Sequence, residues 1–450
     1  MRHMASSLVL GLSLALAAPA LAADPHPTNS YLIRTNGAPD LAAQVSAAGG
    51  TLVYQFPEIG YAAATSNDPG FAARLKHDSS AVQAVDQDME VQWVPSAQQA
   101  NLQTVGSSAS QSSLAPASAF FYACQWNLKQ IDAPGAWAKG YLGSPGVKVA
   151  VLDTGTDPSH VDLQGKIDVP NSISALTPGT SPCGAFDTNT IFDLNFHGTF
   201  LSGLITSNNS GMAGVAPNTQ VVAVKVLNCS GSGRFTDVIR GILYASSLPD
   251  VDVINMSLTA GVPKQSTAAG ILNSALAKAV NYAGSQGKLV VSASGNAGVD
   301  MDHDANLAWL PAQSGSGLGI YATSITDGLA LYSNHGTSGT WVGAPGGDFP
   351  NTAAPLPGCP INPALQGLML STCSSFVCGA NNLYVVGDGT SFATPTVAGV
   401  AALVDAKHGG ALDAAQLKAI LSQTADDLGA TGTDNLFSHG RVNANHAVDQ

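Results

Sequence analysis

Three short segments of the sequence each place a reactive side chain at the end of a predicted strand or at the start of a predicted helix. An apolar run ends in Asp153-Thr-Gly, so the Asp153 carboxylate would stand at the carboxyl end of a strand, where it could orient an imidazole. His197, in His-Gly-Thr, opens an apolar helical stretch. Ser391, in Gly-Thr-Ser-Phe-Ala-Thr-Pro, also opens a helical stretch, where backbone N–H groups favour a developing negative charge.

These residue types together suit nucleophilic catalysis at a carbonyl carbon. A serine nucleophile needs a base within hydrogen-bond reach, and the base needs an acid that orients it. The reaction also needs a donor for the oxyanion, and Asn296 follows a buried apolar run in Ser-Gly-Asn. We therefore predict Ser391 as nucleophile, His197 as base, Asp153 as its orienting acid and Asn296 as oxyanion donor.

Each segment taken alone also has a structural interpretation. Asp153 could cap a turn, and His197 could be a structural histidine. His335-Gly-Thr repeats the tripeptide at His197, but Ser-Gly-Thr follows it and no apolar helical pattern does. Gly-Thr-Ser338 lacks a following helix in the same way. We discount both copies, because no helical stretch follows either of them.

The elements that must position these side chains indicate an α/β fold with a parallel sheet. Short apolar runs that read as buried strands alternate with helix-length segments; they lie at 147–152, 221–226, 251–256 and 289–293. Earlier in the chain, two passes of strand, helix and strand predict a small α+β module, over 31–35, 40–48 and 52–56 and then 59–65, 69–76 and 82–94.

Composition divides the chain further. Residues 1–22 combine Arg2, an apolar run and Ala20-Leu-Ala, the pattern of a secretory signal peptide. That run is too short for a membrane span, and no other stretch approaches the ~20 apolar residues that a span needs. We expect the α+β module at 23–95, a mobile Ser-, Ala- and Gln-rich linker with the processing site at 96–120, and the large α/β domain at 121–450.

The overall composition excludes several classes of function. The 450 residues carry 17 Lys plus Arg against 30 Asp plus Glu, a formal charge of −13, which argues against a nucleic-acid partner. Charge of one sign indicates a soluble protein, and we expect a monomer. Six cysteines in an exported chain favour disulfides over thiols, with 15 pairings open and only Cys373 and Cys378 close enough to suggest a local pair.

The four motifs, in the chain order Asp, His, Asn, Ser, resemble those of the subtilisin-like serine proteases, and the resemblance covers about residues 126–450. It implies a subtilisin-like three-layer sandwich with a mostly parallel central sheet, preceded by a small ferredoxin-like propeptide domain that inhibits the enzyme and assists folding. It also implies a secreted serine endopeptidase that forms an acyl-enzyme and is made as a self-processing precursor. No cofactor is expected for catalysis.

The resemblance further implies how a polypeptide substrate binds. The peptide would lie as an added strand between two segments, with the Ser391 backbone N–H as the second oxyanion donor. The implied substrate-binding residues are Gly231, Ser232, Gly233, Ser257, Leu258, Thr259, Ser294 and Gly295. Thr259 stands where the family usually has Gly, and no Glu occurs beyond position 90, so we predict cleavage after medium or large apolar residues.

Two other departures from the family concern stability. Phe392 stands where the family usually has an oxidation-prone Met, which predicts resistance to peroxide. Asp162 has the separation of a family calcium ligand, but the loop at 207–213 is two residues shorter than the usual ligand loop, so a structural calcium ion stays open. Asp300, Asp302 and Asp304 alternate as calcium ligands do but lack the downstream Glu, which favours a solvated acidic loop.

Two alternative functions stay in view. One is a processing protease of narrow specificity with a single substrate. The other is a catalytically idle binding protein on the same fold, which the intact motifs disfavour. In the main interpretation the protein is secreted, either outside the cell or into a periplasm, its partners are polypeptide substrates and its own propeptide, and nucleic acid and membranes are not among them.

Overall fold

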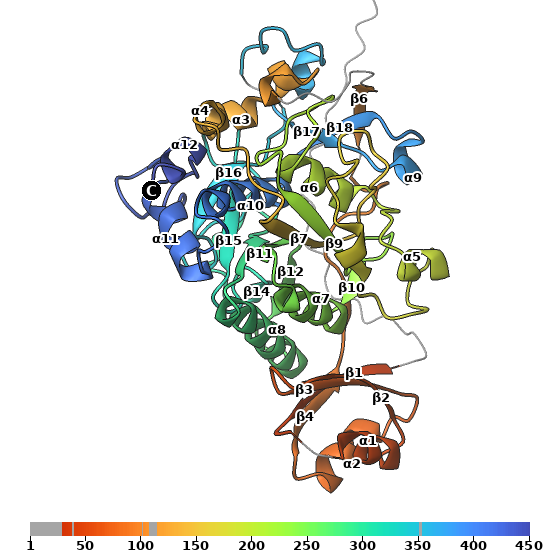
Figure 1. Ribbon diagram of the computed structural model, residues 1–450. Coiled ribbons are helices and arrows are strands. Elements are labelled where there is room, and N and C mark those ends of the chain that lie inside the picture. Colours follow the sequence, from red (N-terminus) through yellow and green to blue (C-terminus); the bar gives the residue numbers. More distant parts are fainter. Residues whose placement is uncertain (1–28, 38–39, 101, 108–114, 351–352) are drawn as a thin grey trace, which may run out of the picture.

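The computed structural model describes residues 29–37, 40–100, 102–107, 115–350 and 353–450 (Figure 1). The predicted signal peptide and part of the predicted linker lie outside these residues. Within the described ranges, no helix is both long enough and apolar enough to cross a membrane.

The centre of the molecule is a seven-stranded sheet in the order β16-β15-β13-β11-β7-β9-β8, and every neighbouring pair is parallel. The four strands predicted from the sequence are confirmed as β7, β9, β11 and β13, all fully or largely buried. The strands are β7 (Lys148–Asp153), β8 (Ile173–Ser174), β9 (Gln220–Lys225), β11 (Val251–Met256), β13 (Leu289–Ala293), β15 (Leu318–Thr323) and β16 (Val342–Pro345).

Helices cover both faces of this sheet, which makes the three layers expected from the sequence (Figure 1). On one face α6 (His197–Ile205) and α10 (Thr390–Lys407) pack together and against the sheet. On the other face lie α7 (Phe235–Ser247) and α8 (Thr267–Ser285). The buried strands are apolar on both sides because both sides are covered.

Shorter elements surround the three layers. They are α3 (Trp126–Gln130), α4 (Ala133–Ala138), α5 (Ala185–Asn189), α9 (Ser375–Cys378), α11 (Ala414–Gln423), α12 (Ala444–Ala447), β10 (Ser232–Arg234), β12 (Ala260–Pro263), β14 (Leu307–Leu310), β17 (Met369–Thr372) and β18 (Leu383–Gly387). All six cysteines are paired, as predicted, in the bonds Cys124–Cys359, Cys183–Cys229 and Cys373–Cys378.

The N-terminal module has the predicted strand-helix-strand order, twice over. Its antiparallel sheet, in the order β2-β3-β1-β4, carries two helices on one face and turns the other toward α7 and α8 (Figure 1). The elements are β1 (Asn29–Thr35), α1 (Leu41–Ala47), β2 (Thr51–Phe56), β3 (Tyr61–Ser66), α2 (Phe71–Asp78) and β4 (Val82–Gln87).

Two features differ from the sequence predictions. The single strand expected over 82–94 is divided, because β5 (Glu90–Gln92) leaves the module and pairs with β10 of the large domain. The linker expected to be mobile contains β6 (Gln103–Ser107), which adds an antiparallel edge strand to β18. Both segments are ordered by strand pairing with distant residues, which local composition does not report.

Candidate active site

Asp153 ends strand β7 with its side chain fully buried. Its two carboxylate oxygens lie 2.9 and 3.0 Å from Nδ1 of His197, and one of these oxygens accepts the Thr154 N–H at 2.7 Å. His197 opens helix α6 and is 1% exposed. The structure therefore brings together the predicted acid and the predicted base, with Nδ1 facing the acid and Nε2 left for a substrate-side proton.

Asp193 fixes the start of helix α6, and the sequence analysis did not single it out. Its carboxylate is fully buried and accepts the backbone N–H groups of Asn195, Phe196 and Thr199 at 2.9 Å each, as well as the Thr199 hydroxyl at 2.7 Å. Burial raises the pKa of Asp193. An aspartate a few residues before an apolar helix is a capping pattern, and this pattern could have identified it.

Ser391 is the second residue of helix α10 and is 9% exposed. Its hydroxyl donates to the backbone carbonyl of Ser257 at 2.9 Å. The ring of the next residue, Phe392, lies 5.8 Å from the His197 ring and stacks on Phe200 at 4.0 Å between centroids. The packing of α6 against α10 thus brings the residue that follows the predicted nucleophile next to the ring of the predicted base.

Asn296 lies against the start of the same helix. Its Oδ1 accepts the Thr390 N–H at 2.9 Å and the Thr390 hydroxyl at 2.7 Å, which fixes the direction of its Nδ2. A Cβ added to Gly389 would lie 3.4 Å from Asn296 Nδ2 and 3.7 Å from the Ser391 nitrogen. The two predicted oxyanion donors therefore flank one space, which the missing side chain of Gly389 leaves open.

The predicted substrate groove holds a segment of the chain itself. Strand β5 pairs antiparallel with β10, with Val91 opposite Gly233. Beyond β5, Trp93 donates its backbone N–H to Gly231 O at 2.9 Å and accepts the Thr259 N–H at 3.4 Å. The Trp93 ring is 3% exposed and donates Nε1–H to Gly233 O at 2.9 Å. A segment of the chain thus lies between the two segments that the sequence analysis predicted as walls of the groove.

The remaining predicted groove residues line or support this region. Ser294 is fully buried and donates its hydroxyl to Asn334 O at 3.0 Å, and the Gly295 N–H donates to Thr390 Oγ1 at 3.2 Å. The Asn334 side chain, which the sequence analysis missed, accepts the N–H groups of Ala297 and Val299 at 3.0 and 3.2 Å. These contacts hold the loop that carries Asn296.

Asp162, the calcium candidate, does not suit a cation. Its carboxylate is fully buried and accepts backbone N–H groups from Ser210, Gly211 and Met212 at 2.7, 2.9 and 3.1 Å and the Tyr384 hydroxyl at 2.7 Å. Burial raises the pKa of Tyr384, which keeps this phenol protonated. Donor hydrogens point at the oxygens that a calcium ion would need.

The three alternating aspartates are also occupied by donors. Asp302 accepts from Thr337 and Ser338, and although partial burial opposes it, these hydrogen bonds lower its pKa to about 2. Asp300 and Asp304 bind the side chains of His303 and Trp309 in the same loop, at 2.7 and 3.0 Å. Among the described residues, no group of three or more His, Cys, Asp or Glu side chains could hold a metal ion.

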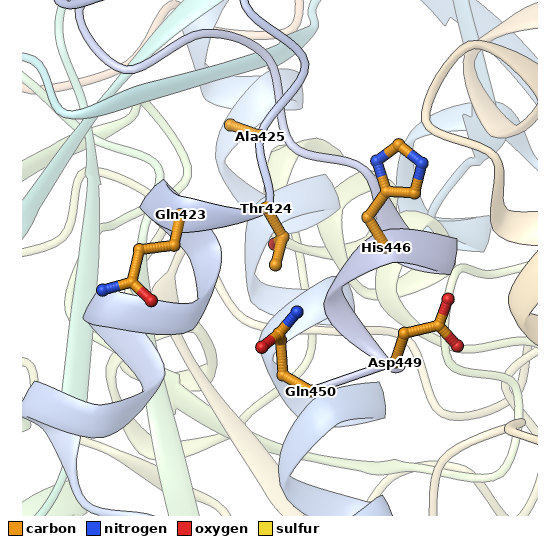
Figure 2. A pocket seen from close by; sticks show the side chains of 6 residues that line it. All are labelled: Gln423, Thr424, Ala425, His446, Asp449 and Gln450. Carbon is orange, nitrogen blue, oxygen red and sulfur yellow. The ribbon is translucent and has the colours of Figure 1, made fainter.

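Two other features lie apart from this constellation. The second His-Gly-Thr copy is part of the acidic loop, since the His335 carbonyl accepts the Met301 N–H at 2.8 Å. A surface hollow of about 300 Å³ lies between the end of α11 and α12 (Figure 2) and contains no predicted site residue. Its lining residues are Gln423, Thr424, Ala425, His446, Asp449 and Gln450.

Comparison with known proteins agrees with this geometry. The subtilase family (Peptidase_S8) matches residues 144–440. Thermitase from Thermoactinomyces vulgaris is 33% identical over 342 residues, which covers 74% of this chain and 99% of thermitase. A thermophilic serine proteinase from Bacillus sp. (strain AK1) is 34% identical over 311 residues, which covers 68% of this chain and 62% of that protein.

A solved structure extends the match in space. The epidermin leader peptide processing serine protease (EpiP) from Staphylococcus aureus superimposes with a TM-score of 0.76 at 21% identity. The superposition covers 94% of this chain and 98% of that one. It therefore reaches beyond the large domain into the N-terminal part of the chain.

Proposed function

The chain belongs to the subtilase family and has its fold, and from this premise we propose that it is a secreted serine endopeptidase that hydrolyses extended polypeptides through an acyl-enzyme and is made as a self-processing precursor. The observation that carries the proposal is the contact of both Asp153 carboxylate oxygens with His197 Nδ1, with Phe392, the residue after Ser391, beside the His197 ring. In this proposal Asp153, His197 and Ser391 form the catalytic triad.

The reaction follows from the positions of these groups. Ser391 Oγ attacks the substrate carbonyl carbon while His197 Nε2 takes the hydroxyl proton, and Asp153 stabilises the imidazolium that forms. Asn296 Nδ2 and the Ser391 N–H hold the resulting oxyanion. The intermediate collapses with cleavage of the C–N bond, and His197 returns its proton to the leaving amine. A water molecule then attacks the ester carbonyl while His197 takes its proton. His197 returns that proton to Ser391 Oγ as the carboxylic acid leaves.

Substrate binding would prepare the nucleophile. The Ser391 hydroxyl donates to Ser257 O, and Ser257 belongs to one wall of the groove. The N–H of a substrate residue that pairs with Ser257 O would displace this hydroxyl, which could then turn to His197. The same wall carries Thr259, and we propose cleavage after medium or large apolar residues there.

The N-terminal module fits the role of an inhibitory propeptide. Residues after β5 fill the groove that a substrate would use, and the module sheet shares a buried core with α7 and α8. Secretion is supported by the signal-like residues 1–22 and by three disulfides, which persist in oxidising compartments.

The test compares the wild-type precursor, Ser391→Ala and Ser338→Ala, all expressed in an exporting host. Ser338 belongs to the second Gly-Thr-Ser copy and is the matched control. We expect the wild type and Ser338→Ala to lose about a quarter of their mass and to digest casein, while Ser391→Ala does neither. Equal trimming of all three chains without casein hydrolysis would contradict a self-processing general protease.

A narrow processing protease is the second candidate. The superposition on EpiP, which is named for leader peptide processing, covers 94% of this chain and so includes most of the module, whereas the thermitase match covers 74%. A protease of this kind would leave casein intact but cleave one protein from its own host at one bond. An unchanged biological effect of Ser391→Ala would instead favour a binding protein.

A further inference from the structure

We propose that Pro95 keeps the bound N-terminal segment from being cut by the active site of its own molecule, and that processing instead occurs in the turn over 96–100 by a second molecule. The inference rests on the proposed function and adds to it the position and the kinetic order of processing. It is carried by the pairing register in the groove, the directions of two carbonyl groups and the exposure of the turn.

The pairing register brings Pro95 to the nucleophile. Trp93 accepts the N–H of Thr259, and in an antiparallel pair each step forward on one strand is a step back on the other. Pro95 is therefore in register with Ser257, whose carbonyl accepts the Ser391 hydroxyl. Residue 95 thus occupies the position whose carbonyl a productive substrate would offer to Ser391.

Proline cannot complete this pairing. It has no backbone N–H, so it cannot donate to Ser257 O, and the Ser391 hydroxyl keeps that acceptor. A residue with an N–H at position 95 would compete for the same carbonyl and release the hydroxyl toward His197. Proline is thus the one residue type at position 95 that leaves the Ser391 hydroxyl bonded to Ser257 O.

The carbonyl oxygens of Val94 and Pro95 already have neighbours in the groove. A Cβ added to Gly231 would lie 2.3 Å from the Val94 oxygen, so this oxygen points at Gly231. The Pro95 oxygen accepts the Asn195 side-chain N–H at 3.3 Å. Both oxygens thus face other partners, whereas attack needs a carbonyl oxygen aligned with Asn296 Nδ2 and the Ser391 nitrogen.

The chain beyond Pro95 is accessible from outside. The Ala100 N–H donates to Ser96 O at 2.9 Å and the Ser96 N–H donates to Gln99 Oε1 at 2.8 Å, which closes a single turn with Gln98 and Gln99 exposed. Strand β6 then holds the chain on β18. The turn is tied at both ends while residues 93–95 fill the groove, so it would have to enter the groove of another molecule.

The experiment follows processing of the purified wild-type precursor, Pro95→Ala and Pro57→Ala at protein concentrations that span 100-fold. Pro57 is an exposed proline of the module and lies outside the groove, so it is the matched control. Mass spectrometry identifies each new terminus. For the wild type and Pro57→Ala we expect a cut between two residues of the 96–100 turn and a first-cut half-life that falls about 100-fold over the range. Pro95→Ala should add a cut between positions 95 and 96 whose half-life does not depend on concentration.

Three outcomes would overturn the inference. They are a wild-type cut between positions 95 and 96, a wild-type cut beyond Gln103, and a Pro95→Ala chain that stays uncut between positions 95 and 96 while its processed form hydrolyses casein. If no chain hydrolyses casein or is processed in a Ser391-dependent way, the proposed function fails, and the inference that rests on it fails with it. The Pro95→Ala, Ser391→Ala double variant must lose the new cut, since otherwise a contaminating protease made it.

Discussion

The two polar atoms of the Asn296 side chain have different roles. We therefore expect the loss of this side chain to affect catalysis and not substrate binding. Oδ1 is held by Thr390, while Nδ2 is free to meet charge that appears only during the reaction. We expect Asn296→Ala to lower kcat about 10²–10³-fold, a value known from a donor in subtilisin of the same family, with little change in KM. Steady-state kinetics on a peptide amide measure both constants. A change confined to KM would contradict the assignment.

Phe392 sets the response of the active site to oxidants. It is 5% exposed, stacks on Phe200 and lies beside the His197 ring. We expect the enzyme to keep most of its activity after treatment with dilute peroxide, because no thioether follows Ser391. The Phe392→Met variant should lose activity in the same treatment, as sulfoxide formation puts a polar group beside the base. Rapid inactivation of the wild type would refute this prediction.

The sequence analysis singled out the residues that we propose to react and missed the residues that hold them in place. Asp153, His197, Ser391 and Asn296 stand in short motifs at strand ends and helix starts, so local pattern was enough. Asn334 reaches the 297–299 loop from another part of the chain, and its contacts depend on the folded sheet. No local pattern distinguishes such a residue from an ordinary loop asparagine.

At the scale of elements, the loop over 207–213 is held by hydrogen bonds to Asp162. Three backbone N–H groups and the Tyr384 hydroxyl satisfy this buried carboxylate. We expect a chelator such as EDTA to leave the melting temperature unchanged and added calcium not to raise it. Differential scanning calorimetry of the Ser391→Ala precursor, which cannot digest itself, measures both.

The Asp162→Asn variant tests the same loop from the protein side. An amide N–H₂ would face donor hydrogens, so we expect the free energy of unfolding to fall by about 1–3 kcal/mol. Tyr384→Phe removes one donor and should cost less. A melting temperature that falls in EDTA for the wild type would show that a cation contributes to the fold despite these contacts.

The elements that the sequence predicted correctly are those with a strong local pattern. Strands β7, β9, β11 and β13 are apolar runs, whereas β15 carries a glycine and β16 is only four residues long. The short strands β5 and β6 exist because β10 and β18 offer them unpaired edges. Pairing of this kind is set by tertiary structure. The local sequence therefore predicted β5 as the end of a strand of the module, and it predicted a mobile linker where β6 lies.

At the scale of the whole molecule, the module and the large domain share one hydrophobic core. Leu32, Phe56 and Tyr61 of the module are buried in the cluster that contains α7 and α8. The sequence predicted both units but not this contact, because apolar residues on the outer face of a sheet do not identify what covers them. The shared core and the strand in the groove together explain how the module could stay bound while the large domain is already folded.

A pair of buried carboxylic acids lies where the module meets the large domain. Asp88 of the module accepts the Thr236 N–H at 3.2 Å, and Asp237 of α7 accepts the Thr177 hydroxyl at 2.8 Å. Burial raises the pKa of both, and the nearby Asp88 charge contributes to bringing the pKa of Asp237 to about 7. The Arg234 guanidinium lies at this site and donates to the backbone carbonyl oxygen of Asp88 at 3.4 Å.

The stability of the precursor should therefore depend on pH in a definite direction. The folded chain binds the Asp237 proton more tightly than the unfolded chain, whose pKa is near 3.8, so this group destabilises the fold progressively as pH rises from about 4 to 7. The slope is at most about 1.4 kcal/mol per pH unit for one group. We expect the melting temperature of the Ser391→Ala precursor to fall over this range more steeply than that of the same chain carrying Asp237→Asn. Equal slopes for the two chains would show that Asp237 ionises in the folded precursor as easily as in the unfolded chain. The stability of the precursor would then not depend on pH through this residue.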